Sequence, residues 1–179
     1  MLKKMKVLKN ERGLTLVELL AVVVILGIIA AIAVPAVGSI IDNSKKDAHV
    51  ANGLQAINSA RLAIATESTL QPTGTNVTII PLGYLLKEGL IESITSPDNS
   101  KQYATTETDV TAKNVATATL PAESYVRITS TSGGFNYEVY LLGDNSGTAK
   151  SRHLGEQNTP ATETTLKGDN STKRATVKN

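Results

Sequence analysis

Glu18 is the residue whose type and position most clearly suggest chemistry, because it is the one charged residue in an apolar run that extends from Leu14 to Val34. A charged side chain at the centre of a bilayer costs roughly 2.5–3.5 kcal/mol on insertion scales, so such an acid usually has a partner. A cut between Gly13 and Leu14 would create an α-ammonium group four residues before Glu18, one helical turn away. This group could pair with Glu18 of its own chain or of a neighbouring copy.

The residues around Glu18 have the length and polarity of a membrane helix. From Leu19 to Val34 every residue is apolar apart from Gly27, and the run that starts at Leu14 approaches the ~20 residues that a spanning helix needs. A basic arm precedes this run directly and contains, against the single acid Glu11, the residues Lys3, Lys4, Lys6, Lys9 and Arg12. Because basic residues stay on the cytoplasmic side, we expect one span, with the N-terminus inside and everything after Pro35 outside.

The run GLTLVELL, which begins at Gly13 after the short basic leader, resembles the class III signal of type IV pilins and pseudopilins. This resemblance implies that a membrane peptidase cuts after Gly13 and methylates the new N-terminus at Leu14. It also implies that Glu18 pairs with the N-terminal amine of a neighbouring subunit during assembly. Leu14 departs from the family pattern, in which phenylalanine is usual at this position.

Gly27 and Pro35 match the positions at which the family's helix is weakened, and the resemblance extends over residues 9–46. Proline removes one backbone hydrogen bond and clashes with the preceding turn, at a cost of about 3 kcal/mol in a helix interior. The sequence therefore predicts a kink or local melting between Gly27 and Pro35. In a filament this site could let the helix stretch; the alternative is a static kink, as in many membrane helices.

Two other interpretations of the N-terminal segment are open. Ala31, Ile32 and Ala33 form a small-residue cleavage pattern after an apolar core, as in an ordinary secretory signal. The acid inside that core and Pro35 just beyond the cut argue against this interpretation. An uncut signal anchor is the second alternative, and it leaves Glu18 without a role.

The charge of a processed chain differs from that of the whole sequence. The chain of 179 residues has 18 Lys and Arg, 16 Asp and Glu and a formal net charge of +2. A cut after Gly13 removes five basic residues and one acid, which leaves 13 against 15 and a net charge of −2. The overall charge therefore gives no support for a nucleic-acid partner. The sequence has no Cys, which excludes disulfides, thiol catalysis and Cys-type zinc sites.

After Pro35 the apolar residues recur at helical intervals on one stripe, at Ile40, Ile41, Val50, Leu54, Ile57 and Ile64. We expect an amphipathic helix over residues 36–66 that packs against another layer. Residues 76–80 read as a strand and residues 81–91 as a short amphipathic helix that ends near Gly89. Residues 124–142 read as a hairpin that turns at Ser132, Gly133 and Gly134. Alternation along its first strand puts Val126 and Ile128 on one face and Tyr125, Arg127 and Thr129 on the other.

The expected fold is α+β, with a long N-terminal helix packed on a small antiparallel β-sheet. The expected parts are a cleaved leader (1–13), a transmembrane or filament-core helix (14–35), an amphipathic helix (36–66), an α+β domain (67–143) and a polar, partly flexible C-terminal segment (144–179). Leu154, Leu166 and Val177 could pin one edge strand in the last part. We otherwise expect the last twenty residues to be disordered or loosely attached.

The sequence offers no pattern for catalysis or for a cofactor. His49 and His153 do not share a ligand-like spacing, and nucleophile-elbow, P-loop and dinucleotide motifs are missing. We therefore expect no enzyme, no metal and no cofactor. The triplet Asp-Asn-Ser recurs at Asp42, Asp98, Asp144 and Asp169. Turns and helix caps explain such residues better than a calcium loop, whose EF-hand spacing is absent.

These observations predict a structural subunit of a type IV pilus, held in the cytoplasmic membrane before it joins a filament on the cell surface. Its partners would be prepilin peptidase, the inner-membrane assembly platform and further copies of the chain, with nucleic acid not expected. The alternative within the class is a minor pilin or pseudopilin of a type II secretion or competence machine. A membrane-anchored or secreted binding protein is the alternative from another class. Adhesion, twitching motility and DNA uptake are all open as roles.

Overall fold

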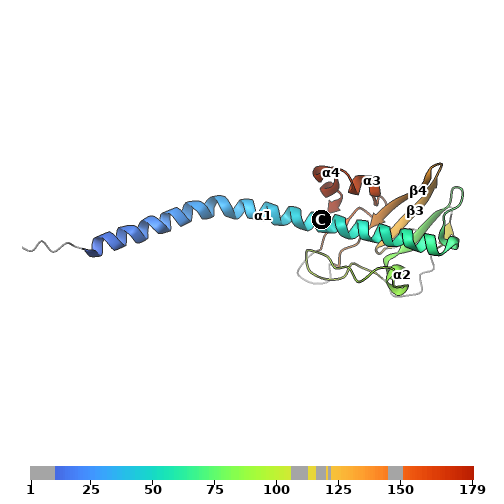
Figure 1. The fold of residues 1–179 in the computed structure, drawn as a ribbon, viewed down its shortest axis with the longest axis horizontal. Helices are drawn as coiled ribbons and strands as arrows, with labels where there is room; N and C mark the ends of the chain where they lie inside the picture. Colours follow the sequence, from blue (N-terminus) through green and yellow to red (C-terminus); the bar gives the residue numbers. More distant parts are fainter. Residues whose placement is uncertain (1–10, 106–112, 116–119, 121, 145–150) are drawn as a thin grey trace, which may run out of the picture. The chain divides into compact units, whose positions relative to one another are not determined.

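The computed structural model describes residues 11–105, 113–115, 120, 122–144 and 151–179 (Figure 1). For residues 11–14 and 113–115 the description extends to the backbone only. The chain divides into two compact units, Met1–Asp42 and Asn43–Asn179. The first unit is helical in all its described residues, and the second, the globular unit, contains the sheets and the hydrophobic core.

Helix α1 (Glu11–Thr66) contributes residues to both units. Its first half is rich in aliphatic residues, and a helix suits such a segment because it satisfies every backbone polar group internally. The last carbonyl groups of a helix have no partner within the helix, and at the end of α1 side chains donate hydrogen bonds to them. Thr66 Oγ1 donates to the carbonyl of Ala63 at 3.0 Å, and Gln71 Nε2 donates to the carbonyl of Ile64 at 3.0 Å.

The described residues after α1 form short elements, which are η1 (Ser68–Leu70), β1 (Val77–Pro81), α2 (Leu82–Lys87), β2 (Lys113–Val115), β3 (Tyr125–Thr131), β4 (Gly134–Tyr140), β5 (His153–Leu154), β6 (Ala161–Thr162), α3 (Glu163–Leu166), α4 (Asn170–Ala175) and β7 (Val177–Lys178). Five strands form an antiparallel sheet in the order β2-β1-β3-β4-β6, and β5 pairs with β7. The predicted α+β fold class is confirmed.

The hairpin predicted for residues 124–142 is confirmed as β3 and β4. Its register pairs Val126 with Val139 and Thr131 with Gly134, so only two residues form the turn. Gly134 has a φ of 133°, which residues with a side chain rarely adopt. The strand predicted at residues 76–80 is β1, whereas the helix predicted over residues 81–91 ends earlier, at Lys87.

The core of the globular unit lies between the second half of α1 and one face of the sheet (Figure 1). The predicted stripe is confirmed from Val50 onward, with Val50, Ile57 and Ile64 buried and Leu54 packed against them. For Ile40 and Ile41 the prediction is wrong, because these residues belong to the first unit and are 62% and 52% exposed. Gly53 allows the close approach of helix and sheet, because a Cβ at this position would lie 2.2 Å from Leu154 Cδ2. A larger residue at position 53 would require the buried side chain of Leu154 to shift.

Strand β3 has buried side chains on both of its faces, and not on one face alone. Val126 and Ile128 face the main core, as predicted from alternation. On the other face Tyr125 is also fully buried, in a second cluster with Ile79 and Tyr140. The sheet therefore has buried residues on both sides.

The C-terminal residues differ most from the sequence prediction. The three predicted pins Leu154, Leu166 and Val177 are buried, but the expectation that the last twenty residues are disordered or loosely attached is wrong. These residues form β6, α3, α4 and β7. Ion pairs with α1 attach these residues to the rest of the globular unit. The spacing of apolar residues in the sequence does not indicate such pairs. The leader residues 1–10 and residues 145–150 of the polar C-terminal segment lie outside the described residues.

Candidate functional site: the apolar half of the long helix

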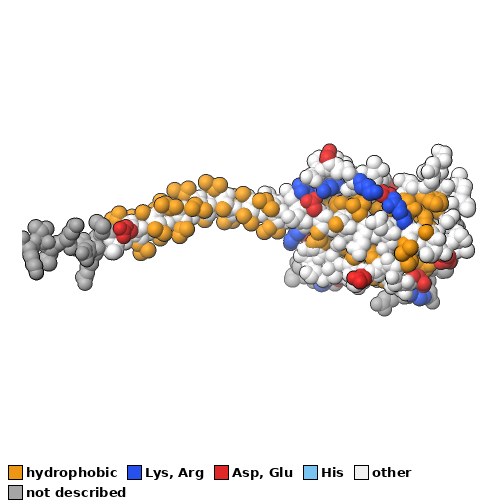
Figure 2. All heavy atoms as spheres, in the orientation of Figure 1, with side chains coloured by type: hydrophobic (Ala, Val, Ile, Leu, Met, Phe, Trp, Pro, Cys, Tyr) orange, Lys and Arg blue, Asp and Glu red, His pale blue; other side chains and the backbone are white. Residues whose placement is uncertain are grey.

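The part of α1 from Thr15 to Ile41, here called the apolar rod, carries aliphatic side chains along its length on the face that Figure 2 shows. Each of its large aliphatic residues is between 50% and 70% exposed. Full burial of one such side chain is worth roughly 1.5–3 kcal/mol, so leaving all of them in water is very unfavourable. The rod therefore needs lipid or other apolar helices around it. By length and composition alone, the described residues contain one helix able to cross a membrane, and the rod is its apolar part.

Glu18 lies in this rod with its side chain exposed. It follows Leu14 by four helical positions, a rise of about 6 Å at 1.5 Å per residue, so the two positions share one face of α1. In the uncut chain Leu14 carries an amide, and only cleavage would give this face a positive charge. The geometry thus fits a charge pair, either within a cleaved chain or between neighbours.

The predicted cleavage site lies at the start of α1, where the backbone of Gly13 and Leu14 is helical. The side chain of Leu14 and the basic residues at positions 3 to 9 lie outside what the structure describes. Cleavage after Gly13 and N-methylation of Leu14 accordingly stay predictions.

Gly27 and Pro35 both lie inside α1, which continues as a helix through these two positions. No heavy atom outside the helix backbone approaches the Cβ position of Gly27 within 4 Å. One turn after Pro35, the hydroxyl of Ser39 donates to the carbonyl of Ala36 at 2.9 Å. The predicted weakening of this segment on assembly or under tension stays a prediction.

The globular unit contains a buried polar network that the sequence did not reveal, centred on His49 of α1. His49 Nε2 lies 3.0 Å from Asp98 Oδ2, and His49 Nδ1 lies 2.6 Å from Tyr103 Oη. The side chain of His49 is fully buried and that of Asp98 almost so. Since a carboxylate only accepts hydrogen bonds, Nε2 carries the proton and Nδ1 accepts from the tyrosine hydroxyl. This network fastens residues 95–103 to α1.

The charges of the network follow from its burial. Burial lowers the pKa of His49 below its ordinary value, although the hydrogen bond to Asp98 works in the opposite direction. Burial alone would raise the pKa of Asp98, but hydrogen bonds from the backbone of Arg152, at 2.9 Å, and from His49 outweigh this effect and lower it. Burial raises the pKa of Tyr103. At neutral pH the network therefore contains a neutral histidine, a carboxylate and a protonated tyrosine.

The side chains of the network around His49 are shielded from solvent. Tyr103 is 1% exposed and also accepts a hydrogen bond from Asn52 Nδ2 at 3.3 Å. A substrate could not reach either ring without opening the core. His153, the second histidine, accepts a hydrogen bond at Nδ1 from the backbone of Gly143 at 3.1 Å.

Two ion-pair clusters attach the C-terminal helices to α1. Asp47 accepts two hydrogen bonds from Arg174 of α4, at 2.9 Å from Nε and 2.5 Å from Nη2. Glu163 of α3 pairs with Arg61 and, at 2.6 Å, with Lys167. The hydrogen bond from Arg174 lowers the pKa of Asp47, and that from Arg61 lowers the pKa of Glu163. Both acids are therefore charged at neutral pH.

The recurring Asp-Asn-Ser triplets have different surroundings. Asp169 caps α4 by accepting from the backbone of Thr172 at 2.8 Å, which is the predicted capping role. Asp98 belongs to the buried network, and Asp42 lies inside α1 rather than in a turn. Asp144 pairs with Lys101 at 3.7 Å. Within the described residues, no three His, Cys, Asp or Glu side chains gather as metal ligands would.

The sequence held partial signals for the residues that we missed. His49 lies four residues before Gly53 and seven before Ala56, on the helix face that packs on the sheet, so its burial was foreseeable. Its partners Asp98 and Tyr103 lie 49 and 54 residues away, and no local pattern connects them.

Residues 8–34 match the family model of the prokaryotic N-terminal methylation motif. The match covers Gly13, Leu14, Glu18 and Gly27, and it confirms the resemblance to the class III signal of type IV pilins. No curated protein and no solved structure is significantly similar to the chain. The N-terminal motif is thus the link to known proteins, while the globular unit has to be understood from its own structure.

Proposed function

We propose that this chain, a precursor with the N-terminal signal of type IV pilins, is the structural subunit of a type IV pilus. Prepilin peptidase removes the leader after Gly13 and methylates Leu14. The apolar rods of many copies then bundle in the core of a surface filament. The observation that carries the proposal is a helix whose large aliphatic side chains are exposed and which has one acid a single turn after the predicted cleavage site.

Glu18 supplies the register of assembly in this proposal. A membrane anchor alone explains the aliphatic side chains, but it leaves the cost of a charge in an apolar environment unexplained. In a filament core an unpaired carboxylate is strongly unfavourable, and the ammonium group of Leu14 on a neighbouring subunit removes that cost. A copy that docks out of register would bury both charges without partners.

Before assembly, the chain is a single-pass protein of the cytoplasmic membrane with its N-terminus inside. The inner-membrane assembly platform extracts it into the filament, where the globular unit faces outward. The proposal gives the chain a structural role and assigns it no catalytic one.

The test is the N-terminal residue and mass of the protein recovered by shearing cells. We expect a chain that starts at N-methylated Leu14. A chain that starts at Val34, or one that keeps Met1, would contradict the proposal. The amount of the protein in the sheared fraction distinguishes a major pilin from a minor pilin or a pseudopilin, because only the first forms most of the filament mass.

A further inference from the structure

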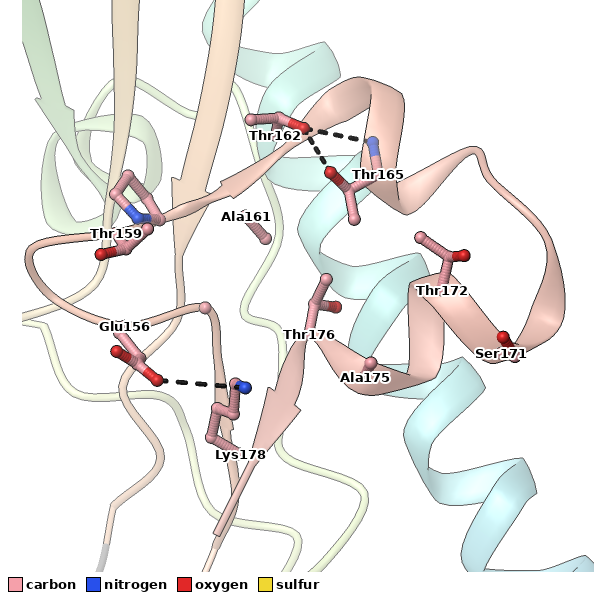
Figure 3. Close-up of a pocket in the computed structure, with 12 residues that line it drawn as sticks. Glu156, Thr159, Ala161, Thr162, Thr165, Ser171, Thr172, Ala175, Thr176 and Lys178 are labelled. Atoms are coloured by element: carbon pink, nitrogen blue, oxygen red, sulfur yellow. Dashed lines mark hydrogen bonds and ion pairs between the residues drawn. The ribbon is translucent and has the colours of Figure 1, made fainter.

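A hollow of about 650 Å³ lies in the C-terminal part of the globular unit, between α3, α4 and the turn that follows β5 (Figure 3). Its size falls in the range of small-molecule sites, which is about 300–1,000 Å³. Half of the twelve residues that line it carry hydroxyl groups, and these are Thr159, Thr162, Thr165, Ser171, Thr172 and Thr176. We call this hollow the hydroxyl pocket.

The hydroxyl groups of the pocket can serve as donors and as acceptors at once. Each threonine or serine hydroxyl has one donor hydrogen and two acceptor lone pairs. The hydroxyls of Thr162 and Thr165 lie 2.5 Å apart, and that of Thr176 donates to the carbonyl of Lys173 at 2.6 Å. The threonine methyl groups with Ala161 and Ala175 add small apolar surfaces between these hydroxyl groups.

The charge of the pocket is balanced. Among its lining residues only Glu156 and Lys178 are charged, and their Oε1 and Nζ atoms lie 4.0 Å apart at one side of the hollow (Figure 3). At that side of the hollow the two charges offset one another, and no other lining residue is charged. A neutral ligand rich in hydroxyl groups fits this lining best.

The walls of the pocket are held in place by the rest of the globular unit. Thr162 caps α3 by accepting from the backbone of Thr165, and Asp169 caps α4. Leu166 and Val177, which flank the lining residues, are buried in the core. A ligand would therefore bind to preformed walls and would not have to order them, which lowers the entropic cost of binding.

From this geometry we propose that the hydroxyl pocket is a binding site for a neutral saccharide. The hydroxyl side chains exchange hydrogen bonds with the sugar hydroxyls, and the methyl groups and alanines contact the C–H faces of the sugar ring. The lining has no aromatic side chain on which a ring could stack, so a single site binds weakly, with a Kd on the order of 1 mM.

Weak single sites become effective when many copies act together. If the chain assembles as proposed above, a filament presents the pocket repeatedly, and multivalent attachment to a glycan-coated surface can exceed the affinity of one site by roughly 10²–10⁴-fold. This avidity rests on the proposed function, whereas saccharide binding by the single chain does not.

The test is saturation-transfer difference NMR on the unassembled full chain, in micelles of a detergent without a sugar headgroup. The neutral probes are lactose, maltose and diacetylchitobiose at 10 mM, and the charged probes are glucosamine and galacturonic acid. We expect saturation transfer to at least one neutral probe. No transfer to any neutral probe, or stronger binding of a charged probe, would overturn the proposal. Because the chain is unassembled, a negative result would leave the filament proposal standing.

Matched variants locate the site. Ala175→Leu places a larger side chain in the hollow, and Thr159→Val removes one hydroxyl while keeping the shape. We expect at least a tenfold loss of affinity for the first and a smaller loss for the second. Ala51→Leu and Thr75→Val make the same changes at exposed positions outside the pocket and should keep wild-type affinity. Equal binding by Ala175→Leu and wild type, or an equal loss in the controls, would overturn the assignment of the site.

Discussion

The two halves of α1 contain similar aliphatic residues, but these residues differ in how much of their surface is exposed. In the apolar rod the large side chains are exposed on every side, whereas in the globular unit Val50, Ile57 and Ile64 are at most 4% exposed. The second half is specified by the sheet on which it packs, down to the missing side chain of Gly53. The large aliphatic side chains of the first half are exposed, so lipid or other apolar helices have to supply their surroundings. Substitutions in the two halves should therefore affect different measurements.

The largest effect is expected for Glu18→Ala, the change that removes the one charge of the rod. In the filament proposal this variant loses the pair with a neighbouring Leu14 ammonium, and we expect the filament yield in the sheared fraction to fall at least tenfold. Membrane insertion and the thermal stability of the globular unit should stay at wild-type levels. Glu88→Ala is the control, since it removes an exposed acid of the globular unit. A normal filament yield for Glu18→Ala would refute the proposed role of this residue.

The next largest effect comes from the same substitution made in each half of α1. Ile57→Ala empties space in the core and should destabilise the globular unit by about 2–5 kcal/mol, measured by thermal or chemical unfolding in micelles. Ile25→Ala removes an equally large side chain from the rod and should leave that unfolding transition unchanged. Equal destabilisation by the two variants would show that the halves are not independent.

The pH dependence of unfolding should report on His49. Burial lowers the pKa of His49 in the folded chain, so the unfolded chain binds its proton first as the pH falls. The contribution of the neutral ring is therefore complete above about pH 6.5, the usual value for histidine, and is lost as the pH falls from there toward the lowered pKa. We expect the melting temperature of wild type to fall between pH 7.5 and pH 5.

His49→Gln should flatten this pH dependence, because glutamine can bond both partners without titrating. The pKa of His153 is also lowered by burial, so His153→Gln should remove a further part of the slope. A wild-type melting temperature that is constant over this range would contradict the assigned protonation of the network.

The smallest effect is expected at the ion pairs that attach the C-terminal helices. Glu163→Gln weakens the contacts with Arg61 and Lys167, whose side chains are 38% and 60% exposed. Solvent screening limits such pairs to about 1 kcal/mol or less, and the loss should shrink further in high salt. Glu156→Gln, in a more exposed and longer pair, should leave the unfolding midpoint unchanged. A loss for Glu163→Gln that persists in high salt would indicate packing rather than charge.

The features that could be predicted from the sequence are those with a local signal. The β3–β4 hairpin was predictable because alternating residues and its turn are adjacent in the chain, and the α1 stripe because its spacing repeats every three or four residues. The His49 network and the ion pair between Asp47 and Arg174 could not be predicted, because their members are 49 to 127 residues apart in the sequence. The same reason explains why the order of residues 160–179 was missed. Ion pairs and caps hold that segment, and its few apolar residues alone suggested a loose tail.

The two-residue turn between β3 and β4 also has a practical consequence. Ser132 and Gly133 are exposed and lie outside the paired residues of the hairpin, and loop tips of this kind are where inserted residues are best tolerated. A short epitope placed between them would label each subunit without entering the core. If the chain polymerises, such an insertion would make every subunit visible and countable on living cells.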